Sequence, residues 1–140
     1  MRCITIVVMI CLLGSCAPEP TTPAMPVDIE NFDPSSATFI ASGEIMGAGG
    51  HIASGVASLY RAGAKLVIVL DPYESQSGPD LKVYLSKDVS ASSFIRVGNL
   101  KATSGKQAYE VPGNPDEAQY PVIHVWCERY SVEFARAILN

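Results

Sequence analysis

Positive charge is scarce in this chain, and no segment concentrates it. Ten Lys and Arg stand against 14 Asp and Glu among the 140 residues, which leaves a formal net charge of −4 at pH 7. Nucleic acids and anionic lipid surfaces are bound chiefly through Lys and Arg side chains. The composition therefore argues against nucleic acid as a partner.

Metal ligands and catalytic motifs are scarce as well. Beyond residue 16 the chain offers only His51, His124 and Cys127, whereas a closed structural zinc site takes four nitrogen or sulfur ligands. It has neither a Cys-x-x-Cys-His sequence for haem attachment nor a Gly-x-Ser-x-Gly nucleophile motif. We expect no metal site and no hydrolase of these kinds. A haem or copper site using one Cys and one His is the alternative that the residue count leaves open.

Long apolar runs are limited to one, at the start of the chain. After Met1-Arg2, the run Ile4–Leu13 is interrupted only by Thr5. It has about half of the roughly 20 residues that a membrane-spanning helix needs. We interpret residues 1–15 as a cleaved signal peptide.

The end of this run, Leu13-Gly14-Ser15-Cys16, resembles the bacterial lipoprotein signal. The resemblance implies that Cys16 becomes the first mature residue and is lipidated, so that acyl chains hold the protein on a membrane. An ordinary signal peptide with a chance cysteine is the alternative. We expect the mature chain in the bacterial cell envelope, outside the cytoplasm. Ala17 is not the Asp of an inner-membrane retention signal, which favours the outer membrane in a Gram-negative cell.

Residues 16–36 are rich in proline. Five prolines fall between positions 18 and 34, and proline disfavours regular helix while favouring extended, solvated backbone. We predict that residues 16–36 form a flexible tether carrying the lipid. The folded domain then spans residues 37–140.

This domain has the pattern of an all-β protein. Short apolar runs alternate with turn sequences every ten to fifteen residues, which is typical of an antiparallel β-sandwich or barrel. The run Lys65–Leu70 does not alternate, so we expect a central strand that is covered on both faces. The last segment could be a strand or a short helix. The eight predicted strands are Thr38–Glu44, His51–Tyr60, Lys65–Asp71, Leu81–Ser86, Phe94–Leu100, Gln107–Val111, Val122–Cys127 and Val132–Leu139.

Cys127 is the residue that stands out in the mature chain. If Cys16 is lipidated and the signal peptide is removed, Cys127 has no partner, although exported proteins normally pair their cysteines. Side chains alternate along a strand, so Cys127 shares a face with Ile123 and Val125, while His124 points to the other face. Cys127 is then either a buried apolar residue or a redox thiol. His51 is the candidate base for a Cys–His pair.

A further set of residues covers the domain in a fixed order. Its members are His51, Ser54-Gly55, Leu70-Asp71, Gly78-Pro79-Asp80-Leu81, Val83-Tyr84-Leu85-Ser86, Leu100-Lys101, Gly105, Gln107, Tyr109, Pro112, Val125-Trp126-Cys127, Val132, Phe134, Ala137 and Leu139. Together they resemble the DM-thirteen domain family of bacterial lipoproteins and animal cell-surface proteins. The resemblance implies a β-sandwich-like fold and a role in electron transfer, with Cys127 at the position of the redox cysteine. Ala135 departs from the family pattern, which commonly has Gly there.

Three functional hypotheses follow. The first is a lipid-anchored electron-transfer module that acts through Cys127 on an envelope protein partner, without being an enzyme on its own. The second is a non-catalytic binding or adhesion module that uses exposed loops such as Tyr73–Pro79 and Pro112–Pro121. The third is a thiol enzyme with His51 as its base, which requires the two side chains to lie within hydrogen-bonding distance.

Overall fold

The computed structural model describes residues 26–140. The predicted signal peptide, Cys16 and the first part of the tether lie outside the described residues. Within the described part of the chain, no helix is long and apolar enough to cross a membrane.

The described residues form eight β-strands and two single-turn 3₁₀ helices, so the all-β prediction is confirmed. The last segment is a strand, and each predicted strand is present with its ends shifted by no more than a few residues. The strands are β1 (Thr38–Gly47), β2 (Ala53–Ala62), β3 (Lys65–Ser75), β4 (Leu81–Ser86), β5 (Phe94–Asn99), β6 (Gln107–Glu110), β7 (Val122–Cys127) and β8 (Val132–Ile138), with η1 at Pro34–Ser36 and η2 at Glu117–Gln119.

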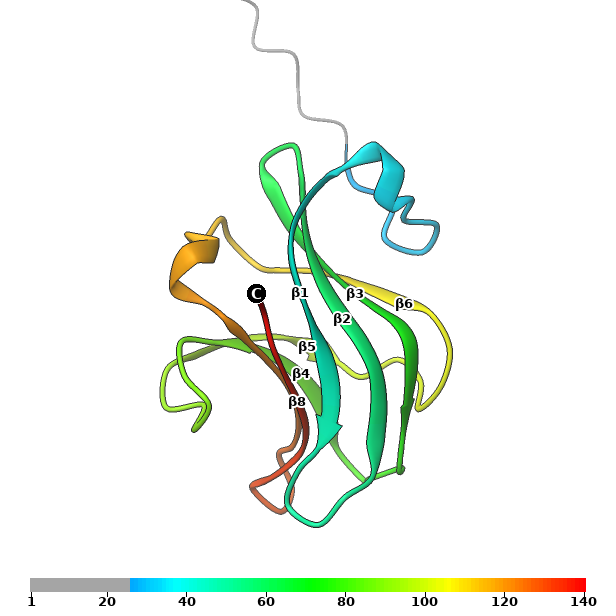
Figure 1. Ribbon diagram of the computed structural model, residues 1–140, viewed down its shortest axis with the longest axis vertical. Helices are drawn as coiled ribbons and strands as arrows, with labels where there is room; N and C mark the ends of the chain where they lie inside the picture. The colour runs from blue at the N-terminus through cyan, green and yellow to red at the C-terminus, as the bar shows by residue number, and fades with distance from the viewer. Residues whose placement is uncertain (1–25) are drawn as a thin grey trace, which may run out of the picture.

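All eight strands belong to one antiparallel sheet that curls into a nearly closed barrel (Figure 1). The strand order is β5-β4-β7-β8-β1-β2-β3-β6, so β5 and β6 are the two edges. The segment after β5 links these edges, because the Lys101 backbone N–H donates a hydrogen bond to the Tyr109 hydroxyl at 2.8 Å. Every other strand has a neighbour on both sides.

The barrel interior is filled by alternating side chains of every strand. Leu66, Ile68 and Leu70 of β3 point inward, while Val67 and Val69 are buried on the outer face. Full burial of a Leu, Ile or Val side chain is worth about 1.5–3 kcal/mol. Strand β3 is thus covered on both faces, as its unbroken apolar run predicts.

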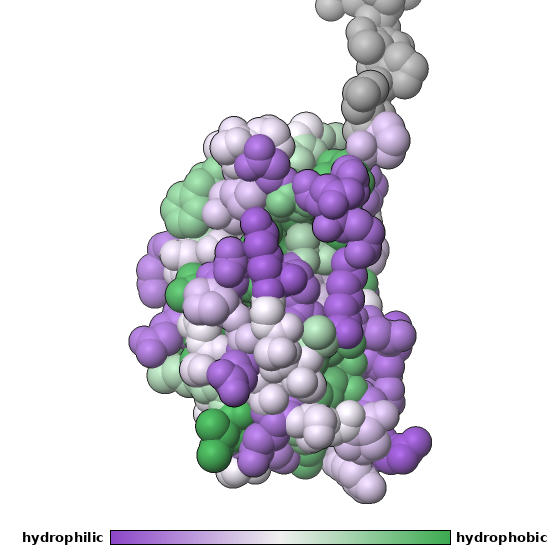
Figure 2. Space-filling view, turned by 90° about the vertical axis from the view of Figure 1, so that its right-hand side faces the viewer, coloured by the Kyte–Doolittle hydropathy of each residue, from purple (hydrophilic) through white to green (hydrophobic). Residues whose placement is uncertain are grey.

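The segment before β1 supplies the outer cover of β3. Phe32 is 7% exposed and packs with Val67, Val69 and Ala108. The predicted tether of residues 16–36 is therefore wrong for its last part, because an aromatic side chain there finds an apolar surface to cover. Figure 2 shows the side of the barrel that lies to the right in Figure 1, where hydrophilic residues are spread between smaller hydrophobic areas.

One loop prediction is also corrected. The predicted exposed loop Tyr73–Pro79 begins later than the sequence indicates, because β3 continues to Ser75 and the Tyr73 side chain is buried in the core. Residues 76–79 lie outside the strands and are mostly exposed. The Tyr73 hydroxyl donates a hydrogen bond to the Ser75 hydroxyl at 2.7 Å, which lets a tyrosine sit in the barrel interior. The second expected loop, Pro112–Pro121, contains η2 and exposed residues.

A β-bulge in β8 fixes which of its side chains point outward. Val125 lies opposite Ala135, and Trp126 lies opposite Glu133, so Phe134 is an extra residue. Both Phe134 and Ala135 point into the core as a result. The bulge breaks the simple alternation of β8 and puts Glu133 and the outward-facing Arg136 on the same outer face.

Candidate functional site

Strand β7 carries the residues that the sequence singles out, and its two faces are as expected. Ile123, Val125 and Cys127 point into the barrel core. His124 and Trp126 point outward, over β4 and β8. The Cys127 thiol and the His124 imidazole therefore lie on opposite faces of the sheet.

Cys127 is a free cysteine with no exposed surface. It belongs to the central apolar cluster of the barrel, and its backbone pairs with Leu81 of β4 and Val132 of β8. Thiol chemistry needs the thiolate, which apolar surroundings disfavour, and it needs access for the reacting partner. In this closed fold Cys127 has neither an accessible path nor a charged partner in its cluster.

His51 does not pair with Cys127. It lies between β1 and β2, where its Nδ1 is 3.0 Å from the carbonyl oxygen of Ala48. Its ring stacks on Phe134, with centroids 3.6 Å apart and planes 16° from parallel. Among residues 26–140 no hydrogen bond joins His51 to Cys127, and the imidazole packs on the ring that the β8 bulge turns inward. The structure therefore gives no support to His51 as the base of a thiol enzyme.

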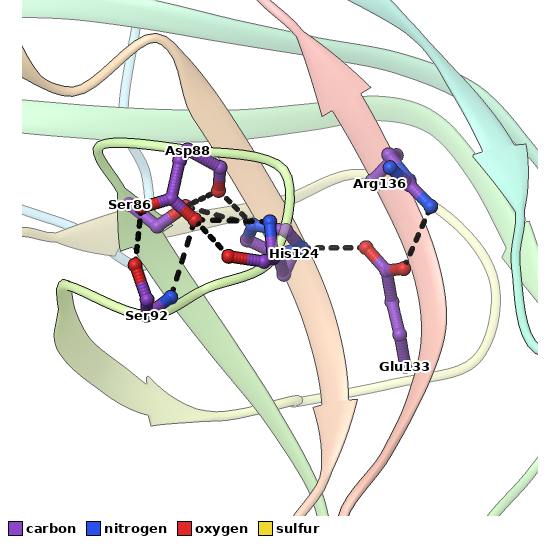
Figure 3. Close-up of polar contacts among 7 residues, drawn as sticks. Ser86, Asp88, Ser92, His124, Glu133 and Arg136 are labelled. Carbon is purple, nitrogen blue, oxygen red and sulfur yellow. Dashed lines mark hydrogen bonds and ion pairs between the residues drawn. The ribbon is translucent and has the colours of Figure 1, made fainter.

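His124 is the centre of a buried polar network on the outer face (Figure 3). Its side chain has no exposed surface. Nδ1 lies 2.6 Å from Oε1 of Glu133, whose other oxygen pairs with Arg136 at 3.0 Å. Nε2 lies 2.7 Å from Oγ of Ser86 and 3.2 Å from the carbonyl oxygen of Asp88. Strands β4, β7 and β8 and the loop after β4 meet at this one ring.

The order Ser86–His124–Glu133 resembles the hydrogen-bonded chain of a catalytic triad, but the protons are placed differently. The Ser86 hydroxyl lies 2.6 Å from the carbonyl oxygen of Asp88 and donates its only hydrogen there, because a carbonyl can only accept. Nε2 of His124 must then donate to Oγ. In a catalytic triad the serine hydroxyl donates to the imidazole instead. With Ser86 fully buried as well, the network is structural.

The network holds down the loop between β4 and β5. At the tip of this loop, the Asp88 carboxylate accepts hydrogen bonds from the backbone N–H groups and hydroxyls of Ser90 and Ser92, at 2.5–3.2 Å. These donors hold the pKa of Asp88 well below its usual range. The loop is thus closed by its own carboxylate and fastened to the sheet through the Asp88 carbonyl and His124.

A second outer cluster lies beside this network and is built from aromatic rings. Tyr84 stacks on Phe94 with centroids 4.1 Å apart, and on Trp126 at 6.1 Å. The Tyr84 hydroxyl donates a 2.8 Å hydrogen bond to Oε1 of Glu128, which also accepts from Nε of Arg96 at 2.7 Å. Burial, followed by the bond to Glu128, raises the pKa of Tyr84 to about 12.

One cavity in the barrel interior is too small for a cofactor. A cavity among Ile45, Leu70 and Val125 has a volume of about 10 Å³, which is barely the size that admits one water molecule. Within residues 26–140, no three His, Cys, Asp or Glu side chains are grouped to hold a metal ion. Cys127 and His124 point to opposite faces of β7, so these two side chains do not form a joint Cys–His site for haem or copper.

Sequence reasoning found the face of His124 but not its partners. Alternation along β7 places His124 outside, where a lone histidine is expected to be solvated. Its burial depends on Glu133, which the bulge turns outward, and on a loop that starts 38 residues earlier at Ser86. The sequence gives only a weak signal for this network. His124 lies between apolar residues of one strand, and Glu133 and Arg136 are three residues apart in the next strand.

Comparison with known proteins identifies one family. The family described as electron transfer DM13 matches residues 46–139, which is well over half of the chain. This range contains β2 to β8, the last two residues of β1 and both outer clusters. No curated protein and no solved structure matches the chain.

Proposed function

On the premise that this chain belongs to the electron transfer DM13 family, we propose that it is an electron-transfer module held at the bacterial cell envelope by lipid on Cys16. The match over residues 46–139 carries the electron-transfer part. The sequence Leu13-Gly14-Ser15-Cys16 and the preceding apolar run support the anchor. A protein partner in the envelope exchanges electrons with the domain.

Cys127 is the redox residue that this proposal tests first. It is the one cysteine of the folded domain, and it lies at the end of β7 next to the turn into β8. Strand ends open more readily than strand centres, through local unfolding that costs less than global unfolding. Because the Cys127 thiol is fully buried in the folded state, its reaction with a partner requires local opening of β7 and β8.

The experiment is native-state labelling of the full chain with a maleimide, followed by peptide mapping so that Cys127 is read separately from the other cysteines. If Cys127 works as a thiol, its labelling rate exceeds the rate set by global unfolding and is independent of low urea concentrations. Labelling that follows global unfolding at every urea concentration removes Cys127 from the mechanism.

The anchor is tested independently. Cells expressing the chain incorporate labelled palmitate into it and retain it in the membrane fraction, whereas Cys16→Ala loses both. Retention of the label in Cys16→Ala would contradict the anchor. It would leave the electron-transfer part of the proposal untouched, because that part depends on residues 46–139.

A second candidate function is a non-catalytic envelope binding module, and the complete burial of Cys127 favours it. The two functions separate on one variant. Cys127→Ala leaves capture of an envelope partner unchanged if the domain only binds. The same variant abolishes electron exchange with that partner if the thiol carries the electron.

A further inference from the structure

The outer aromatic cluster connects a buried tyrosine with an exposed aromatic ring. Tyr84 is 5% exposed and lies in a stack with Trp126 and Phe94. Phe94, at the edge strand β5, is 45% exposed. The stack therefore extends from a buried phenol to the protein surface, where another molecule can come into contact with it.

The Tyr84 hydroxyl is also tied to a carboxylate. It lies 2.8 Å from Oε1 of Glu128, and the guanidinium of Arg96 donates to the same oxygen at 2.7 Å. These two hydrogen bonds, Arg96 first, hold the pKa of Glu128 below its usual value. Glu128 is therefore an anion at neutral pH, placed to receive the phenolic proton along an existing hydrogen bond.

A buried phenol of this kind is oxidised only if its proton leaves with the electron. Loss of an electron makes the phenolic hydrogen strongly acidic, and a base within hydrogen-bonding distance accepts it. Glu128 is such a base, and its side chain is 30% exposed, so the proton can then pass to water. Within residues 26–140, the other stacked or edge-packed tyrosine, Tyr60, contacts Phe32 and Phe39 and has no hydrogen bond to a carboxylate.

We propose that Tyr84 is a one-electron redox residue of this domain and that Glu128 is its proton acceptor. The inference rests on the proposed electron-transfer function and adds a site to it. A one-electron oxidant docked over Phe94 takes one electron from Tyr84 and is itself reduced by one electron. The phenolic O–H bond breaks, its proton binds Glu128, and a neutral tyrosyl radical remains. Return of one electron to the radical and of the proton from Glu128 restores the phenol.

The test uses the full chain and a photogenerated ruthenium(III) tris-bipyridine complex as the one-electron oxidant. Rapid freezing and electron paramagnetic resonance then identify the radical. We expect a tyrosyl signal in the wild type that is absent in Tyr84→Phe. Glu128→Gln keeps a hydrogen-bond acceptor but cannot take the proton, so it should slow radical formation by at least about tenfold. Tyr60→Phe is the matched control and should leave signal and rate unchanged.

Two results would overturn the inference: an undiminished tyrosyl signal in Tyr84→Phe, or a rate in Glu128→Gln equal to that of the wild type. Circular dichroism of each variant shows whether it is folded. A slower rate in heavy water for the wild type is a second readout that needs no variant. Cys127→Ala should keep the Tyr84 signal, so loss of this site and loss of the proposed thiol function are distinguishable.

Discussion

Removing the imidazole of His124 is the sharpest test of how the outer face of the barrel is held together. In His124→Ala, Oε1 of Glu133 loses its 2.6 Å partner and Oγ of Ser86 loses its 2.7 Å partner. Glu133 keeps Arg136, and Ser86 keeps the Asp88 carbonyl. The variant therefore loses the contacts of the ring with Glu133, Ser86 and the Asp88 carbonyl oxygen, and it leaves a cavity where the ring was.

The expected cost follows from burial. Leaving a buried donor or acceptor without its partner typically costs about 1–3 kcal/mol, and the Glu133 side chain is only 13% exposed. Because His124 bonds partners on both sides of its ring and its removal also leaves a cavity, we expect a loss of about 3 kcal/mol. With a typical urea dependence of about 2 kcal/mol per M, the unfolding midpoint should fall by about 1.5 M.

Urea unfolding followed by the fluorescence of Trp126 measures this effect, since Trp126 is the single tryptophan of the chain and lies two residues from His124. Far-UV circular dichroism should give the same midpoint if unfolding is two-state. Ser86→Ala removes two hydrogen bonds, but the two groups left behind, Nε2 of His124 and the Asp88 carbonyl oxygen, still lie 3.2 Å apart and bond each other. This variant should therefore cost only about 1 kcal/mol. A loss below 1 kcal/mol in His124→Ala, or equal losses in both variants, would refute the reasoning.

Three further predictions concern other parts of the fold. Cys127→Ser should lower the free energy of unfolding by about 1–3 kcal/mol because it buries a hydroxyl without an acceptor, and Cys127→Ala should lower it less. Denaturant unfolding measures both losses, and a larger loss in Cys127→Ala would contradict an apolar environment of Cys127. The pKa of Asp88 is lower in the fold than its ordinary 3.8, so its contribution to stability is present above that value and is lost as pH falls below it. In Asp88→Asn the free energy of unfolding should therefore decrease less steeply at acid pH. The same pH dependence in the variant and the wild type would count against the loop contacts. In Gly43→Ala the added methyl carbon would clash with the carbonyl oxygen of Ile138, which should push β1 from β8 and cost about 1–3 kcal/mol. Hydrogen exchange in β8 should then become faster, and unchanged exchange there would contradict this contact.

Much of the fold could be predicted from local patterns. The alternation of apolar residues locates the strands, and glycine and proline mark the turns between them. The unbroken run Lys65–Leu70 correctly indicates a strand buried on both faces. The prediction failed where a local pattern meets a distant surface: Phe32 in a proline-rich segment reads as tether, yet it covers β3.

The candidate sites were less predictable. Alternation along β7 correctly gives the faces of His124 and Cys127. It could not show that His51 stacks on Phe134 instead of approaching Cys127, because that contact depends on a bulge in another strand. The Tyr84–Glu128 hydrogen bond joins residues 44 positions apart, and no sequence motif records it.

The sequence by itself determined an all-β domain, the inward face of Cys127 and the outward face of His124, because side-chain alternation and turn chemistry act over a few residues. Only the tertiary structure decided that the thiol is sealed and that the imidazole is buried among Ser86, Asp88 and Glu133. Those outcomes depend on strand order, register and one extra residue in β8. Such features arise from the packing of the whole barrel, so no short segment of the chain specifies them.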